Sequence, residues 1–67
     1  MPRREESLSS SAIASAGYDD DTQVLDVTFT SGQTYTFQGV PQSVFDALIA
    51  SSSPGRFYHQ NIKGIYG

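Results

Sequence analysis

The chain has 67 residues, a formal net charge of −3 and no cysteine, which limits it to one domain near the smallest size at which a hydrophobic core suffices. The lack of cysteine excludes a disulfide framework, a thiolate metal site and a thiol nucleophile, and it fits a reducing cytoplasm. No apolar run has the length of a signal-peptide core or a membrane span, so we expect a soluble cytoplasmic protein with no membrane partner.

The charges are unevenly distributed along the chain. Residues 10–46 include five aspartates and no basic residue, whereas from Ala47 onward the only charged residues are Arg56 and Lys63, with His59 between them. The acidic total argues against long-range attraction to nucleic acid, but the C-terminal third leaves room for one mildly basic face.

The N-terminal third is predicted to contain a tail, a strand and a turn. Residues 1–9 are polar and lack hydrophobic periodicity, so we expect a disordered tail. Ser10–Tyr18 is predicted to be a strand anchored by Ile13, with a β-bulge at Gly17. Three adjacent aspartates in Asp19–Gln23 would suit a hard cation, but the segment lacks the spaced ligands and glycine of an EF-hand. A turn in which aspartates bond their own backbone explains it better.

The next segment is predicted to be a β-hairpin, because Val24–Thr30 and Gln33–Gln38 alternate apolar with polar residues. A two-residue turn would mix apolar and polar residues on both faces, which a half-buried sheet does not tolerate. A three-residue loop, Thr30-Ser31-Gly32, keeps the faces distinct and puts glycine where a left-handed residue is needed. The predicted pairs are Phe29 with Gln33, Val27 with Tyr35 and Leu25 with Phe37, and these residues except Gln33 form the predicted apolar face.

Two helices are predicted after the hairpin. The first, Pro41–Ser51, begins at a proline and carries an apolar stripe that should cover the hairpin's apolar face. The second, Pro54–Ile62, has Ser53 as its predicted N-cap and Gly64 as its C-cap. The stripe of the first helix is Val44, Phe45, Leu48 and Ile49; that of the second is Phe57, Tyr58 and Ile62. Ile65 and Tyr66 are expected to dock back, as a brief strand.

These elements predict an α+β fold: a three-stranded antiparallel β-meander covered on one face by two C-terminal helices, in a single domain over residues 10–67. The predicted core consists of Ile13, Leu25, Val27, Phe29, Tyr35, Phe37, Val44, Phe45, Leu48, Ile49, Phe57 and Ile62.

The order of several short motifs resembles the KTSC domain, a small domain found at the C-terminus of some lysyl-tRNA synthetases and as a free-standing bacterial or phage protein. The matching motifs are Ser10-Ser11 with Ile13, Gly17-Tyr18-Asp19, Leu25-Asp26-Val27 through Phe29, Gly32, Tyr35-Thr36-Phe37, Gly39-Val40-Pro41, Ser53-Pro54-Gly55, and Asn61-Ile62 through Tyr66. The resemblance implies a compact α+β domain of no established activity, for which RNA binding is suggested by the synthetase context. Phe37 replaces the family's second tyrosine, so a role that needs that hydroxyl is not carried over.

Two groups of residues are candidates for RNA contact. Tyr35 and Phe37 could stack unpaired bases, but the predicted register places both in the core under the first helix, where bases cannot reach. A surface near the second helix is the better candidate, because cationic and aromatic side chains together hold phosphates and stack bases. Its residues are Arg56, Tyr58, His59, Lys63 and Tyr66. An ordinary solvated helix would show the same pattern.

We therefore expect a small non-catalytic interaction module that contacts RNA, with a protein-binding module acting on a nucleic-acid enzyme as the alternative. Hydrolytic activity would need His59 near a nucleophile in a cleft. No phosphate-binding loop or metal-ligand spacing occurs in the sequence, so no cofactor is expected.

Overall fold

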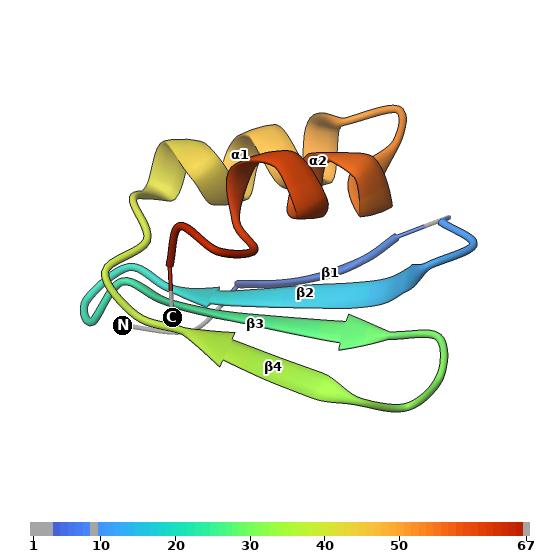
Figure 1. The fold of residues 1–67 in the computed structure, drawn as a ribbon. Coiled ribbons are helices and arrows are strands. Elements are labelled where there is room, and N and C mark those ends of the chain that lie inside the picture. The colour runs from blue at the N-terminus through green and yellow to red at the C-terminus, as the bar shows by residue number, and fades with distance from the viewer. Residues whose placement is uncertain (1–3, 9, 67) are drawn as a thin grey trace.

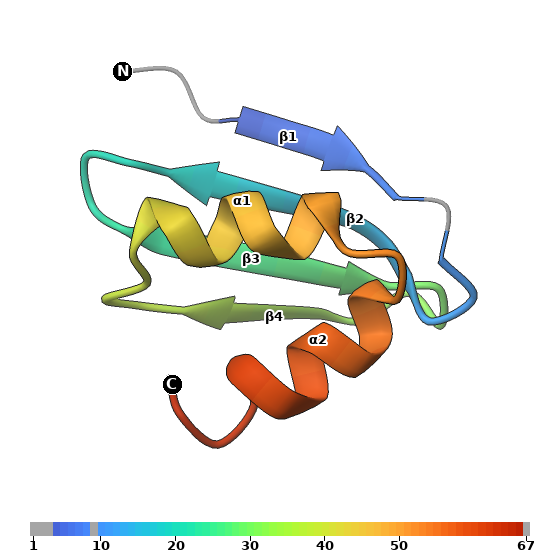
Figure 2. The same cartoon turned by 90° about the horizontal axis from the view of Figure 1, so that it is seen from above.

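A computed structural model describes residues 4–8 and 10–66 as a four-stranded antiparallel sheet with two helices on one face (Figure 1). The strands follow chain order across the sheet, β1-β2-β3-β4. Seen from above, α1 crosses β2 and β3, whereas α2 lies toward β4 (Figure 2). The elements are β1 (Arg4–Ser7), β2 (Ile13–Asp19), β3 (Val24–Phe29), β4 (Thr34–Phe37), α1 (Gln42–Ala50) and α2 (Pro54–Asn61). Neither helix is long and apolar enough to span a membrane.

The α+β class is confirmed, but the prediction of three strands is wrong because β1 adds a fourth. Arg4 pairs with Tyr18 and Ser7 with Ser15, so part of the expected disordered tail is an edge strand. All four β1 side chains are exposed. Backbone hydrogen bonds therefore form this strand without the buried alternation that sequence patterns detect. In the rest of the expected tail, Leu8 is half-buried, and residues 1–3 and 9 lie outside the described residues.

One side chain ties β1 to the helical layer. The Arg4 guanidinium bonds Asp46 on α1 at 3.0 Å and lies 5.0 Å from the centre of the Phe45 ring. Both charged side chains are roughly half exposed, so water and salt screen their attraction.

Arg4→Ala should lower the free energy of unfolding by about 1 kcal/mol, the combined effect of an exposed ion pair and an exposed cation–π contact. Urea unfolding of Arg4→Ala, Asp46→Ala and the double variant would isolate the coupling, with Glu6→Ala as a control on the same strand. A coupling that is zero at low salt would contradict the role given to this contact.

The predicted hairpin register is confirmed. Leu25 pairs with Phe37 and Val27 with Tyr35. The Phe29 amide donates to the Gln33 carbonyl at 2.8 Å, and Gly32 has φ +100°, the left-handed region that the three-residue loop requires. The alternation of apolar residues and one glycine was enough to determine this pairing.

The strand predicted over Ser10–Tyr18 starts later, at Ile13. The Ser10 hydroxyl accepts hydrogen bonds from the amides of Ala12 and Ile13, which makes residues 10–12 a turn. The register shift lies between Ile13 and Ser15, not at the predicted Gly17. Gly17 is paired on both sides, with Glu5 and Asp26.

Both predicted helices form, with small differences at their ends. Pro41, the predicted first residue of the helix, is instead the N-cap of α1 because its ψ of 151° is extended, so the helix begins one position later, at Gln42. Pro54 is the first residue of α2, as predicted, but the Ser53 side chain makes no capping hydrogen bond. The C-cap of α2 is Ile62, not the predicted Gly64, which lies two residues farther along the chain and has φ +83°.

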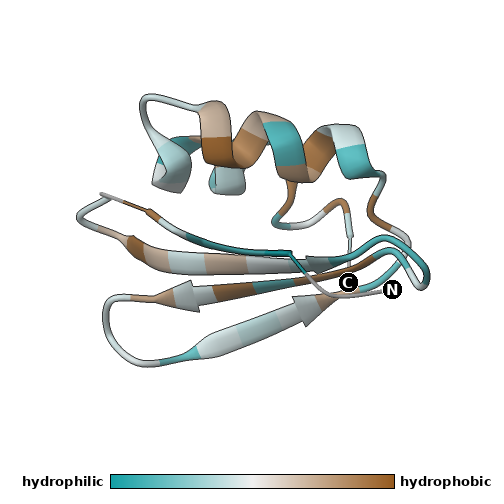
Figure 3. Cartoon of the chain, turned by 180° about the vertical axis from the view of Figure 1, so that it is seen from behind, coloured by the Kyte–Doolittle hydropathy of each residue, from teal (hydrophilic) through white to brown (hydrophobic). Residues whose placement is uncertain are grey.

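The core lies between the sheet and the helices, and hydrophobic positions occur along the strands and helices of both layers (Figure 3). Of the twelve predicted core residues, Tyr35 is the exception: it is 46% exposed, so its placement in the core is wrong. Phe29, Val44, Ile49 and Phe57 are partly buried against the core. The buried hydrophobic core residues are Ile13, Ala16, Tyr18, Leu25, Val27, Phe37, Val40, Phe45, Leu48, Tyr58 and Ile62. Ala16, Tyr18, Val40 and Tyr58 were absent from the predicted set.

The C-terminal segment docks back only in part. Tyr66 packs against the core, and its amide donates to the Ile62 carbonyl. Ile65 is 62% exposed. The predicted brief strand is reduced to an isolated bridge between Lys63 and Tyr66.

Candidate interaction surface

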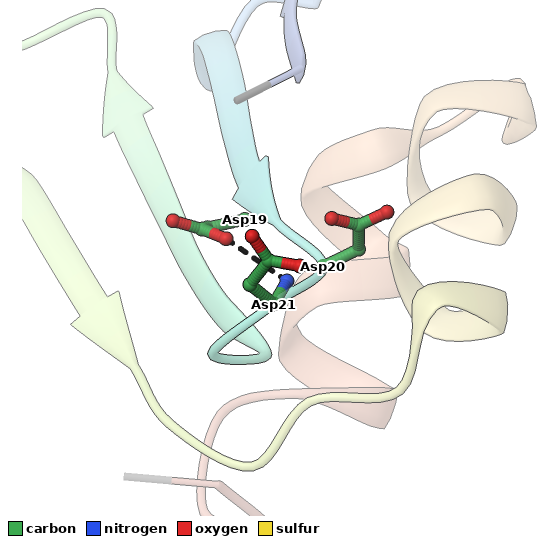
Figure 4. Close-up of side chains that lie close together, drawn as sticks. All are labelled: Asp19, Asp20 and Asp21. Atoms are coloured by element: carbon green, nitrogen blue, oxygen red, sulfur yellow. Dashed lines mark hydrogen bonds between the residues drawn. The ribbon is translucent and has the colours of Figure 1, made fainter. Parts of the chain in front are cut away.

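The three aspartates of the β2–β3 connection form a turn, as predicted. The Asp19 carboxylate accepts a hydrogen bond from the Asp21 amide at 3.0 Å, a bond in which the Asp20 side chain takes no part (Figure 4). One oxygen from each carboxylate lies within 4.8 Å of the others. Exposed aspartates in a turn commonly cluster in this way without an ion, because they hydrogen-bond their own backbone.

The exposed side of α2 borders two hollows, which we name by their linings. The serine hollow, of about 480 Å³, is lined by the serines at positions 10, 11, 52 and 53, together with Arg56 and His59. It lies where the turn before β2 approaches the α1–α2 connection (Figure 2). That approach is close, because a Cβ on Gly55 would lie 3.0 Å from the Ala12 Cβ.

The aromatic hollow, of about 300 Å³, lies between α2 and the tip of the β3–β4 hairpin. It is lined by Phe29, Ser31, Gln33, Tyr35, Tyr58, His59 and Lys63. His59 therefore borders both hollows. Together, Arg56, His59, Lys63 and the two hollows form what we call the α2 face.

The α2 face carries the unpaired positive charge of the described chain. Arg56, His59 and Lys63 are exposed, and none of them forms an ion pair with a described residue. No acidic side chain lines either hollow. The aspartates are elsewhere, in the β2–β3 turn, on β3 and on α1. The face can thus attract an anion without first displacing an internal partner.

The structure brings together four of the five predicted contact residues. Arg56, Tyr58, His59 and Lys63 line one or both hollows, whereas Tyr66 lines neither. Tyr58 lines the aromatic hollow, although its side chain is only 6% exposed. Burial raises the pKa of its hydroxyl, and the nearby Tyr35 hydroxyl raises it further.

Gln33 and Tyr35 were not among the predicted contact residues. The register put Tyr35 on the apolar side of the sheet, which is correct, but β4 is an edge strand and the helices leave the ring half uncovered. In the serine hollow, Ser10 and Ser11 were placed in the predicted strand and Ser53 was predicted as an N-cap, so none of these serines was a predicted contact residue. No sequence pattern showed that residues 10–12 and α2 would meet.

The hydrolase alternative gains little from this geometry. His59 shares the serine hollow with four serines, but it makes no hydrogen bond to any of them in the described part of the chain. A nucleophilic serine needs such a base within hydrogen-bond reach.

A family model describing the KTSC domain matches residues 9–66. The chain belongs to the KTSC family. A KTSC domain protein of Yersinia pestis has a crystal structure that superposes with a TM-score of 0.91 at 35% sequence identity, covering 98% of this chain and 93% of that one. The family assignment suggested by the sequence motifs is thus confirmed.

The related proteins include small proteins and a large enzyme. The KTSC chain is 48% identical over 56 residues to a protein of Tsukamurella paurometabola, covering 84% of each. It is 43% identical over 56 residues to an uncharacterised protein of Stutzerimonas stutzeri, covering 84% of this chain and 79% of the relative. A lysine–tRNA ligase of Trichormus variabilis is 38% identical over 47 residues, 70% of this chain but 8% of the ligase. The family description and the two small relatives name no catalytic activity.

Proposed function

We propose that this KTSC domain is a non-catalytic interaction module that binds single-stranded RNA across the α2 face. The observation that carries the proposal is the combination of unpaired cationic side chains with an exposed aromatic ring around the same two hollows. Cationic grooves that hold the backbone, together with rings that stack bases, are the usual components of single-strand binding sites. The similarity to part of a lysine–tRNA ligase adds an RNA context, and the lack of cysteine supports a cytoplasmic setting.

The small number of cationic side chains on the α2 face favours a single strand over a duplex. Arg56 and Lys63 supply two cationic contacts, one at each hollow. Two contacts are too few for tight duplex binding, which relies on neutralising many phosphates. Stacking on exposed rings is available only to bases that are not paired inside a helix.

Binding of a fluorescein-labelled ten-nucleotide RNA should weaken by about sevenfold between 50 and 200 mM salt, the effect of two phosphate contacts on a single strand. Arg56→Gln and Lys63→Gln should each lower the affinity and reduce that salt effect to about threefold. Fluorescence anisotropy measures both quantities.

Gln42→Glu is the matched control, because it lowers the net charge by the same unit at the start of α1 and lies in neither hollow. Equal weakening by all three substitutions would show that only net charge matters and would contradict the assigned site. No binding at 20 mM salt would refute RNA binding altogether.

A protein-binding module acting on a nucleic-acid enzyme is the second candidate, favoured by the exposed Tyr35 and by the match to a segment of the ligase. Such a module should present a continuous aromatic patch. Among the described residues, the exposed large hydrophobic side chains are Tyr35 and Ile65. Two side chains make a small patch, and for that reason we rank this candidate second.

A further inference from the structure

The aromatic hollow is built from a connected series of rings. Phe29 lies between Tyr35 and Tyr58, with ring centres 5.5 and 5.0 Å away and interplanar angles of 81° and 79°. The His59 ring lies 5.4 Å beyond Tyr58. Phe29 and Tyr58 are largely covered, whereas Tyr35 is 46% exposed. Tyr35 therefore offers an aromatic surface to a ligand, and the other rings hold it in position.

The polar groups of the hollow point to a particular ligand chemistry. The Tyr35 hydroxyl donates a hydrogen bond to the Gln33 amide oxygen at 2.8 Å. The Gln33 amide nitrogen has no hydrogen-bond partner among the described residues. Because the oxygen is engaged, Gln33 can offer an incoming group two N–H donors. Lys63 adds a cation at the same hollow, where no carboxylate competes.

We propose that the aromatic hollow holds one unstacked nucleobase that carries a ring carbonyl. The base stacks on Tyr35, the Gln33 amide nitrogen donates to the carbonyl oxygen, and Lys63 contacts the adjoining phosphate. This inference rests on the proposed function, because it takes single-stranded RNA as the ligand and names the part of it that enters the hollow. A hollow of about 300 Å³ is at the lower end of the range for small-molecule sites and suits one base.

The engaged oxygen of Gln33 predicts which bases are preferred. Glutamine pairs with adenine by accepting from the amino group and donating to a ring nitrogen. Here one of the two lone pairs of that oxygen already accepts from the Tyr35 hydroxyl, which makes the oxygen a weaker acceptor for the adenine amino group. Uracil, cytosine and guanine each have a carbonyl that can accept from the free N–H groups, whereas adenine accepts only at ring nitrogens such as N7, beside an amino group that is itself a donor. The hollow should therefore discriminate against adenine.

Anisotropy titrations with ten-nucleotide oligouridine, oligoadenine and an abasic sugar–phosphate strand of equal length test the proposal. Oligouridine should bind about fivefold more tightly than oligoadenine, the effect of one hydrogen bond. The affinity for oligouridine should exceed that for the abasic strand by about tenfold, the effect of stacking one base. In amide NMR spectra of the unmodified protein, oligouridine should shift the Gln33 side-chain NH₂ signals.

Two variants at Tyr35 separate stacking from hydrogen bonding. Tyr35→Leu should reduce oligouridine binding about tenfold, to the level of the abasic strand. Tyr35→Phe keeps the ring but removes the hydroxyl that bonds the Gln33 oxygen. Oligoadenine should then bind more tightly, and the fivefold preference for oligouridine over oligoadenine should decrease. Circular dichroism would confirm that both variants fold, which is expected for an exposed residue on an edge strand.

Failure of the proposed base site can be distinguished from failure of the proposed RNA binding. Equal affinity for all three strands, no change at Gln33 and unaltered binding by Tyr35→Leu would overturn the base site. The proposed function would survive that result if Arg56→Gln and Lys63→Gln still weakened binding. No binding of any strand at low salt would overturn both.

Discussion

Phe45→Ala should leave no stably folded domain at 25 °C. The Phe45 side chain is 0% exposed, and its ring is stacked on Tyr18 with centres 5.2 Å apart and planes 15° from parallel. Truncating a buried phenylalanine to alanine costs about 3–5 kcal/mol. A domain of this length has a total stability of about 3–10 kcal/mol, so the loss removes most or all of it. Thermal and urea unfolding followed by circular dichroism measure the effect.

Phe45→Leu is the matched control, because it keeps most of the buried volume. We expect it to fold with a lower melting temperature, since a leucine does not reproduce the ring stacking on Tyr18. A melting temperature for Phe45→Ala within a few degrees of the unmodified protein would show that the contact between α1 and the sheet is not the main source of stability.

Tyr18→Phe should have the second largest effect, although it removes a single oxygen. The Tyr18 hydroxyl donates a hydrogen bond to the Val40 carbonyl at 2.5 Å, and Tyr18 and Val40 are 1% and 0% exposed. The substitution leaves that carbonyl buried without its partner, which costs about 1–3 kcal/mol. In a domain of this size each kcal/mol lowers the melting temperature by about 4–8 °C. An unchanged melting temperature would mean that water replaces the lost donor.

The same hydroxyl makes stability depend on alkaline pH. Burial raises the pKa of Tyr18, and the carboxylates of Asp20, Asp46 and Asp19 raise it further. A tyrosine whose pKa is higher in the folded state stabilises the fold while it stays protonated. That contribution is complete below the unfolded value of about 10 and disappears as the pH rises through the folded value.

Tyr18→Phe should therefore lose less stability above pH 10 than the unmodified protein does. Some dependence should persist, because burial also raises the pKa of Tyr58, with a further contribution from Tyr35. Urea unfolding at several pH values from 8 to 11 compares the two proteins. Identical slopes would contradict the assigned role of the buried hydroxyl.

The elements that the sequence predicted well are those whose residues alternate or recur within a short segment. The hairpin register follows from alternating residues and Gly32, and α1 follows from its stripe around Phe45 and Leu48. The strand β1 could not be predicted in this way, because all its side chains are exposed and its pairing with β2 uses the backbone. A strand without a buried face leaves no hydrophobic period to detect.

The largest error concerned two tyrosines, whose predicted environments are interchanged. Tyr35 was placed in the core and Tyr58 on the surface, but Tyr35 is 46% exposed and Tyr58 is 6% exposed. Register determines which face of the sheet a side chain occupies, but not how far the helices extend over it. The position of α2 relative to β4 depends on contacts between distant segments, and local patterns do not contain that information.

The candidate surface was predicted only in part, because local sequence patterns do not show which distant segments meet. Arg56, His59 and Lys63 come from one short segment, so their proximity could be expected from the sequence. The contributions of the hairpin tip and of residues 10–12 arise only when the chain folds back on itself. Sequence reasoning thus predicted the charges of the surface but not its shape.

The chain of rings that runs from Tyr35 through Phe29 to Tyr58 and on to Phe37 has an optical consequence. The protein contains four tyrosines and no tryptophan, so its near-ultraviolet emission comes from tyrosine alone. Tyr35 is the most exposed of them, and a molecule covering it would change that emission directly. Tyrosine emission therefore reports whether a ligand covers Tyr35, and ligands could be screened by fluorescence without a label.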